Sequence, residues 1–150
     1  MKISDLLKIK GRPVITIGPN ETVSAAIQKL VENDRGSLAV CSDKGELAGI
    51  ITERDIVRKC FARSDAFANI KIQDVMTKQV AIGTPEDDLD YAISVMRQKR
   101  IRHLPIVDNQ KVVGMVSMRD LLDLQLDQTT AEIRYIGLLS RRTQRRSFLD

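Results

Sequence analysis

The chain has 150 residues, of which 43% are hydrophobic, 29% charged and 3% aromatic. Its apolar runs are too short for a membrane span, no signal peptide is visible, and two cysteines, Cys41 and Cys60, favour a reducing, cytoplasmic location. The formal net charge of +4 falls to +1 without residues 141–150, which hold four arginines and one aspartate, so a nucleic-acid-binding surface spread over the fold is not expected.

In chain order, the first half reads as a strand, an amphipathic helix, a hairpin and a second helix. The first helix has its apolar residues at helical spacing behind Thr22, a good N-cap residue. The hairpin has short β-prone runs on both sides of a turn that contains Gly45. The predicted elements are a strand at 14–17, a helix at 23–31, strands at 37–42 and 47–52, and a helix at 53–61.

The second half repeats the first. Residues 85–96 align with 19–30, and residues 114–122 align with 49–57, at offsets of 66 and 65. Such self-similarity predicts two copies of one structural unit. The predicted elements of the second copy are a weaker strand at 80–82, a helix at 89–96, strands at 103–108 and 112–117, and a helix at 118–126.

The expected fold class is therefore α+β, with two β-α-β-β-α repeats packed around a pseudo-twofold axis. One copy alone leaves an apolar sheet face open, which the other copy can cover, and ligand sites are expected in the cleft between them. The predicted division is an N-terminal segment at 1–12 that contributes to the first repeat, repeats at 13–62 and 72–127, and a C-terminal helix with an arginine-rich tail at 128–150.

The strongest local pattern occurs once in each copy, as Gly49–Asp55 and Gly114–Asp120, where a strand passes into a helix. A hydroxyl followed three residues later by an acid resembles a capping box, so the simplest interpretation is a helix start. The arginine inside each helix adds a second interpretation, because a helix N-terminus with an arginine favours a phosphate and the acid can accept ribose hydroxyls. The candidate nucleotide-binding residues are Thr52, Arg54, Asp55, Ser117, Arg119 and Asp120.

A second group of candidates lies where the second hairpin begins. Arg100, Arg102 and His103 could gather anionic phosphates, whereas the first copy has Gly36 and Ser37 at the corresponding place, so two sites would differ. We find no metal-ligand spacing and no nucleophile paired with a base, and the cysteines lie in apolar segments typical of a core. These observations favour a binding protein and not an enzyme.

Together these motifs resemble those of a tandem CBS-domain pair, the Bateman module, and in particular small stand-alone bacterial CBS-domain proteins. The resemblance rests on Ile72–Thr77, on Arg102–Val107 and on the two Gly-to-Asp segments. It implies repeats packed through their sheets, a flat homodimer, and no required cofactor. It also implies an adenosyl ligand such as AMP, ADP, ATP, NAD or S-adenosylmethionine in the cleft, and a regulated protein partner of unknown identity.

The same resemblance implies a role for each candidate residue. Asp55 and Asp120 would bind ribose hydroxyls, with Thr52 and Ser117 beside them. The remaining assignments are Thr16, Ile17 and Ile82 along the base or sugar, Ile101 on the adenine, and Arg102 and His103 toward the phosphates.

Two other functions remain open at this stage. The chain could be a ligand-free interaction scaffold that acts through the C-terminal helix. It could also bind nucleic acid through Arg141, Arg142, Arg145 and Arg146, although the nearly neutral remainder of the chain argues against this.

Overall fold

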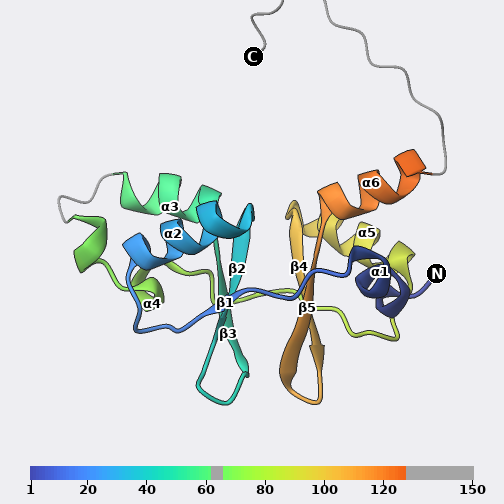
Figure 1. Ribbon diagram of the computed structural model, residues 1–150, viewed down its shortest axis with the longest axis horizontal. Coiled ribbons are helices and arrows are strands. Elements are labelled where there is room, and N and C mark those ends of the chain that lie inside the picture. Colours follow the sequence, from blue (N-terminus) through green and yellow to red (C-terminus); the bar gives the residue numbers. More distant parts are fainter. Residues whose placement is uncertain (62–65, 128–150) are drawn as a thin grey trace, which may run out of the picture.

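The computed structural model describes residues 1–61 and 66–127 and consists of two similar halves side by side (Figure 1). In each half a small sheet stands near the centre of the molecule and helices cover its outer side. None of the helices in these ranges is long and apolar enough to cross a membrane. The mixed α+β architecture with two strand-and-helix repeats agrees with the sequence prediction.

The first half contains a three-stranded sheet in the order β1-β2-β3. Strand β1 pairs in parallel with β2, and β2 pairs antiparallel with β3. Thr77 bridges to Ile50 of β3 through two backbone hydrogen bonds of 2.9 and 3.0 Å. The elements of this half are β1 (Thr16–Ile17), α2 (Val23–Asn33), β2 (Ser37–Cys41), β3 (Leu47–Thr52) and α3 (Glu53–Cys60).

The second half contains only an antiparallel pair of strands, β4 and β5. The prediction of a strand at 80–82 is wrong, because the backbone next to β4 forms only an isolated bridge at Gly83. Gly83 exchanges backbone hydrogen bonds of 3.0 and 2.9 Å with Pro105 and Val107. Pro105 has no N–H with which to continue this ladder, whereas Ala39 stands at the matching position of the first half. The elements are α5 (Leu89–Lys99), β4 (His103–Asp108), β5 (Lys111–Ser117) and α6 (Met118–Asp127).

The segments that precede the two repeats are exchanged between the halves. Helix α1 (Ile3–Lys10), expected to contribute to the first repeat, buries Ile3 and Leu6 in the core of the second half. Conversely, η1 (Phe67–Asn69) and α4 (Ile72–Val75) lead into the second repeat, yet Ile72 lies in the core of the first half. Figure 1 shows α1 beside α5, on the opposite side of the molecule from β1.

Backbone hydrogen bonds explain this exchange. The Ile3 N–H donates to the Asp87 carbonyl at 2.8 Å, and the Ile72 N–H donates to the Glu21 carbonyl at 2.8 Å. Each segment thus pairs with the loop before the first long helix of the opposite half. The apolar side chains of the short helix α1 are buried in the core of the second half. The N-terminal segment therefore stabilises the second half.

A third cluster of apolar side chains joins the two halves. Ala39, Cys41 and Ile50 of the first sheet pack with Met115 of the second. Cys60 lies in the core of the first half, so the prediction that both cysteines are core residues is confirmed by their burial. Burial also raises the pKa of the Cys41 thiol, which disfavours the reactive thiolate.

The predicted C-terminal helix and arginine-rich tail, residues 128–150, lie outside the described residues. The scaffold and nucleic-acid hypotheses depend on that segment.

Candidate ligand-binding cleft

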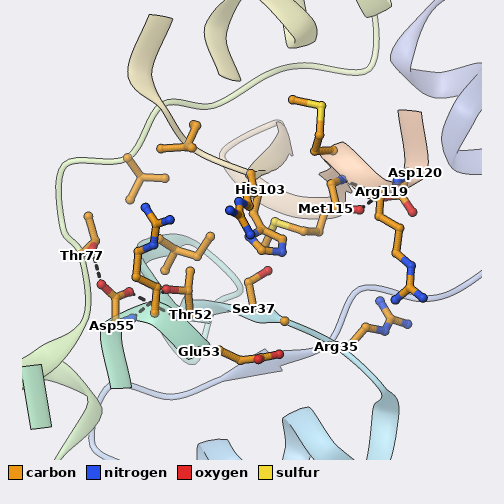
Figure 2. A pocket seen from close by; sticks show the side chains of 18 of the residues that line it. Arg35, Ser37, Thr52, Glu53, Asp55, Thr77, His103, Met115, Arg119 and Asp120 are labelled. Atoms are coloured by element: carbon orange, nitrogen blue, oxygen red, sulfur yellow. Dashed lines mark hydrogen bonds between the residues drawn. The ribbon is translucent and has the colours of Figure 1, made fainter. Parts of the chain in front are cut away.

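One cavity of about 1260 Å³ lies between the two halves, at the place where the hairpin strands meet the starts of α3 and α6 (Figure 2). Residues from both halves line it, so neither repeat forms it alone. The cavity brings together most of the residues predicted from the sequence: Thr52, Arg54, Asp55, Ile101, Arg102, His103, Ser117, Arg119 and Asp120.

Asp55 marks one end of the cavity. Its Oδ2 accepts a hydrogen bond from the Thr52 N–H at 3.1 Å, and its own N–H donates to Thr52 Oγ1 at 3.0 Å, which completes a capping box. Its Oδ1 accepts from the Thr77 hydroxyl at 3.1 Å and lies 3.3 Å from the Lys59 ammonium. Both oxygens of this carboxylate are therefore already engaged within the chain.

Asp120 marks the other end with the same local geometry. Its Oδ2 accepts from the Ser117 N–H at 2.8 Å, and its N–H donates to Ser117 Oγ at 3.1 Å. Lys10 is the last residue of α1, and its ammonium group lies 2.9 Å from the same Oδ2. Oδ1 has no hydrogen-bond partner among residues 1–61 and 66–127, so Asp120 retains a free acceptor in the cavity.

His103 begins β4 in the middle of the cavity, where it pairs with Ser117 across the hairpin. A Cβ added to Gly36 would lie 3.3 Å from His103 Nε2, so the absence of a side chain on Gly36 leaves room for the imidazole. Burial lowers the pKa of His103; Asp120 raises it, and Arg102 and Lys10 lower it. The neutral ring is thus favoured.

Further cations line the cavity that the sequence analysis did not assign to the site. Lys10 and Arg12 come from the N-terminal segment, and Arg35 follows α2. Two backbone carbonyls hold Arg35: Pro13 O lies 3.0 Å from a terminal guanidinium nitrogen, and Asn33 O lies 3.3 Å from Nε. No local motif marks these residues, because their place in the site depends on the exchange of α1 and on the packing of the two halves.

Three predicted residues lie elsewhere. Thr16 and Ile17 line a separate cavity of about 350 Å³, and Ile82 lines neither of the two cavities. In the first copy the main cavity is lined by Ile15, the residue before Thr16. In the second copy it is lined by Ala81, the residue before Ile82. In β1 the Ile17 side chain points into the core of the first half, which removes it from the cleft.

The arrangement is suited to binding a ligand with hydroxyl, anionic and apolar parts. It offers carboxylate oxygens for hydroxyl groups, several guanidinium groups for anions, and apolar side chains such as Ile101 and Met115 for a flat ring. Within the described part of the chain, no group of three or more His, Cys, Asp or Glu side chains could hold a metal ion.

Comparison with known proteins agrees with this geometry. The family model described as "CBS domain" matches the chain twice, at residues 3–62 and 72–127. The mitochondrial CBS domain-containing protein CBSX3 of Arabidopsis thaliana is 31% identical over 143 residues, which cover 90% of this chain and 69% of that protein.

Solved structures share the fold. The crystal structure of the CBS domain NE2398 superposes with a TM-score of 0.80 at 33% identity, covering 84% of this chain and 98% of that one. The CBS domain pair of protein MJ0100, in complex with 5′-methylthioadenosine and S-adenosyl-L-methionine, gives a TM-score of 0.75 at 28% identity, covering 86% and 98%. The chain therefore belongs to the CBS-domain family, as a tandem CBS pair of the kind that serves as a regulatory module.

Proposed function

We propose that this protein is a non-enzymatic sensor that binds an adenosine-containing ligand in the cleft between its two CBS domains and signals to a partner protein. The observation that carries the proposal is the placement of Asp55 and Asp120, one from each domain, in a single cavity. Two separate helix starts would satisfy the capping interpretation without sharing a cavity.

The chemistry of the cleft supports this ligand class. A ribose presents two adjacent hydroxyl groups, which donate to a carboxylate, and the free Oδ1 of Asp120 can accept one of them. Ile101 and Met115 offer apolar contact to an adenine ring, while Arg102, His103 and the helix-start arginines are placed for phosphates. AMP, ADP, ATP and NAD are the ligands to test first. The similar MJ0100 pair, which binds adenosine-type ligands, supports the choice.

The test is calorimetric titration of the purified protein with these ligands, together with the variants Asp55→Ala and Asp120→Ala. Loss of a hydrogen-bonded carboxylate costs about 1–3 kcal/mol of binding energy, so we expect affinity to fall at least about ten-fold for the aspartate that holds the ribose. Asp90→Ala is the control, because Asp90 is also an acid in the first turn of a helix but is exposed and lies outside the cavity. Unchanged affinity in both cleft variants would refute the assignment.

We further propose that two copies associate through helices α2, α3 and α6. These helices carry exposed apolar side chains, among them Val31, Val57 and Leu122, which are 75%, 68% and 54% exposed. Such side chains are unfavourable in water and favour a second copy as cover. Light scattering should give the mass of a dimer for the native chain, and Val57→Asp should reduce it to that of a monomer. A monomeric native chain would exclude the dimer.

The proposed location is the cytoplasm, on the ground that two cysteines do not make the disulfide framework of a small secreted protein. Fractionation of the source cells with an antibody against the protein would test it.

A further inference from the structure

Two arginines from different domains converge at one end of the cleft. Figure 2 shows the guanidinium groups of Arg35 and Arg119 pointing toward one another, beside Asp120. Both line the main cavity. Arg35 leaves the end of α2 in the first domain, and Arg119 lies in the first turn of α6 in the second.

Neither arginine is neutralised by a carboxylate. Among the described residues, Arg35 and Arg119 form no ion pair, and the side chain of Arg119 makes no hydrogen bond. Arg35 has only the carbonyls of Pro13 and Asn33, and Arg12 donates to the same Asn33 carbonyl at 2.8 Å. Like charges held together in this way repel one another unless an anion lies between them.

The nearby charges increase this effect. Burial, and then the neighbouring Arg12, lower the pKa of the Arg35 guanidinium, whereas Asp120 and Asp34 raise it. The carboxylate of Asp120 is itself paired with Lys10 at 2.9 Å. Asp120 is thus already paired with Lys10. Asp34 and Glu53 also line the cavity, but within the described chain neither forms an ion pair with Arg35 or Arg119.

The Asp55 end differs. The repeat alignment places Arg54 opposite Arg119, but it places Ile101 opposite Arg35. That end therefore has an apolar side chain where the Asp120 end has a guanidinium. Asp55 also has both oxygens occupied, by Thr52, Thr77 and Lys59, whereas Asp120 keeps Oδ1 open. The Asp120 end therefore offers both a ribose acceptor, the open Oδ1, and the two facing guanidinium groups of Arg35 and Arg119.

We propose that Arg35 and Arg119 form a clamp for a phosphate group at the Asp120 end of the cleft, so that the ligand held there is a phosphorylated nucleoside and not an uncharged one. The inference rests on the proposed function and adds to it the ligand class, the end of the cleft that is used, and a residue, Arg35, that the motifs do not contain. Guanidinium groups recognise phosphate oxygens with paired, directional hydrogen bonds, and two of them on opposite sides of one phosphate replace repulsion by attraction.

The experiment compares charged and uncharged ligands on the same protein. Titrations with ADP, AMP, adenosine and 5′-methylthioadenosine are made with the native chain and with Arg35→Ile, Arg119→Gln and the control Arg97→Gln. Ile is the residue at the matching position of the second domain, and Arg97 is an exposed arginine of α5 outside the cavity. We expect the two cleft variants to weaken ADP binding roughly ten-fold or more, to leave adenosine affinity unchanged, and Arg97→Gln to match the native chain.

Arg119→Gln is included because Arg35→Ile could weaken ADP binding simply by disturbing the fold. Arg35→Ile removes hydrogen bonds to two carbonyls, whereas Arg119 is exposed and has no described partner. Unchanged ADP affinity in Arg119→Gln, or equal affinity of the native chain for adenosine and ADP, would overturn the clamp while leaving the proposed function intact.

A titration with inorganic pyrophosphate distinguishes failure of the phosphate clamp from failure of adenosine recognition. If the native chain binds pyrophosphate but neither nucleotide nor nucleoside, and Arg119→Gln abolishes that binding, the clamp is supported and adenosine recognition fails. If none of the four ligands and no pyrophosphate bind, both claims are overturned.

Discussion

The ammonium group of Lys10 lies 2.9 Å from Oδ2 of Asp120 and also donates to the Met115 carbonyl at 2.6 Å. Lys10 ends the N-terminal helix, and Asp120 begins α6 near the other end of the described chain. Both side chains are almost buried, with 14% and 15% of their surface exposed. The N-terminal helix thus contributes a side chain to the cleft beside the second domain.

Substitution of Lys10 by Met should destabilise the protein. The variant leaves the partly buried Asp120 carboxylate with one fewer partner, and we expect the free energy of unfolding to fall by about 1–3 kcal/mol. Urea denaturation measures the change. Lys2→Met is the matched control, because the Lys2–Glu86 pair is exposed and such pairs contribute no more than about 1 kcal/mol. Equal losses in the two variants would show that the Lys10–Asp120 pair has no special importance.

Substitution of Ile3 by Ala tests the exchange of the N-terminal segment. Ile3 is fully buried in the core of the second domain, and loss of such a side chain costs about 2–5 kcal/mol. Ile9→Ala, in the same helix but 59% exposed, should change the free energy of unfolding by less than about 0.5 kcal/mol. Urea denaturation followed by circular dichroism distinguishes the two variants. A helix that did not pack on the second domain would make both substitutions equally mild.

The matching glycines Gly49 and Gly114 should respond differently to alanine. A Cβ on Gly49 would lie 2.6 Å from the Thr77 carbonyl oxygen, whereas a Cβ on Gly114 would meet only the Leu7 side chain, at 2.8 Å and beyond. The carbonyl is fixed by the bridge to Ile50, but the end of a leucine can move. We expect Gly49→Ala to cost more than Gly114→Ala, within the range of about 1–3 kcal/mol typical of overpacking.

Thermal unfolding of the two glycine variants shows which substitution lowers the stability more. Gly49→Ala should also displace Thr77 from Asp55, which amide exchange at the Thr77 N–H would detect as faster exchange. A larger loss in Gly114→Ala would contradict the contact with Thr77.

The lowered pKa of His103 predicts a pH dependence. Burial disfavours the protonated ring, so the unfolded chain binds this proton at a higher pH than the folded chain does. The stability that the neutral ring contributes is complete above its ordinary pKa of 6.5 and is lost as the pH falls through the lower pKa of the folded state. Urea denaturation between pH 7.5 and 5 should show falling stability.

His103→Gln is the control for this effect, because a glutamine does not titrate. The free energy of unfolding of the variant should decline less steeply over that interval than that of the native chain. Parallel curves would assign the decline to other groups and would contradict a buried, neutral His103.

The amino-acid sequence by itself determined the features that depend on residues close in the chain. The repeat specified two similar halves, and the Thr52–Asp55 and Ser117–Asp120 segments specified two helix starts, because a capping box joins residues three positions apart. The prediction that both lie in one cleft followed from pairing the two repeats, and ten of the thirteen candidate residues, Arg100 among them, line it.

Only the tertiary structure decided how the two ends of that cleft differ. The sequence places Lys10 and Arg35 far from Asp120, and no local pattern connects them. Their approach depends on the packing of α1 against the second domain and on the contact between the two sheets. The absence of a strand at 80–82 also depends on the tertiary structure. Pro105 can interrupt the pairing only because its edge of β4 is the one that faces residue 83, and the sequence does not say which edge that is. Contacts between distant residues are set by the burial of apolar surface from the whole chain, which no short segment encodes.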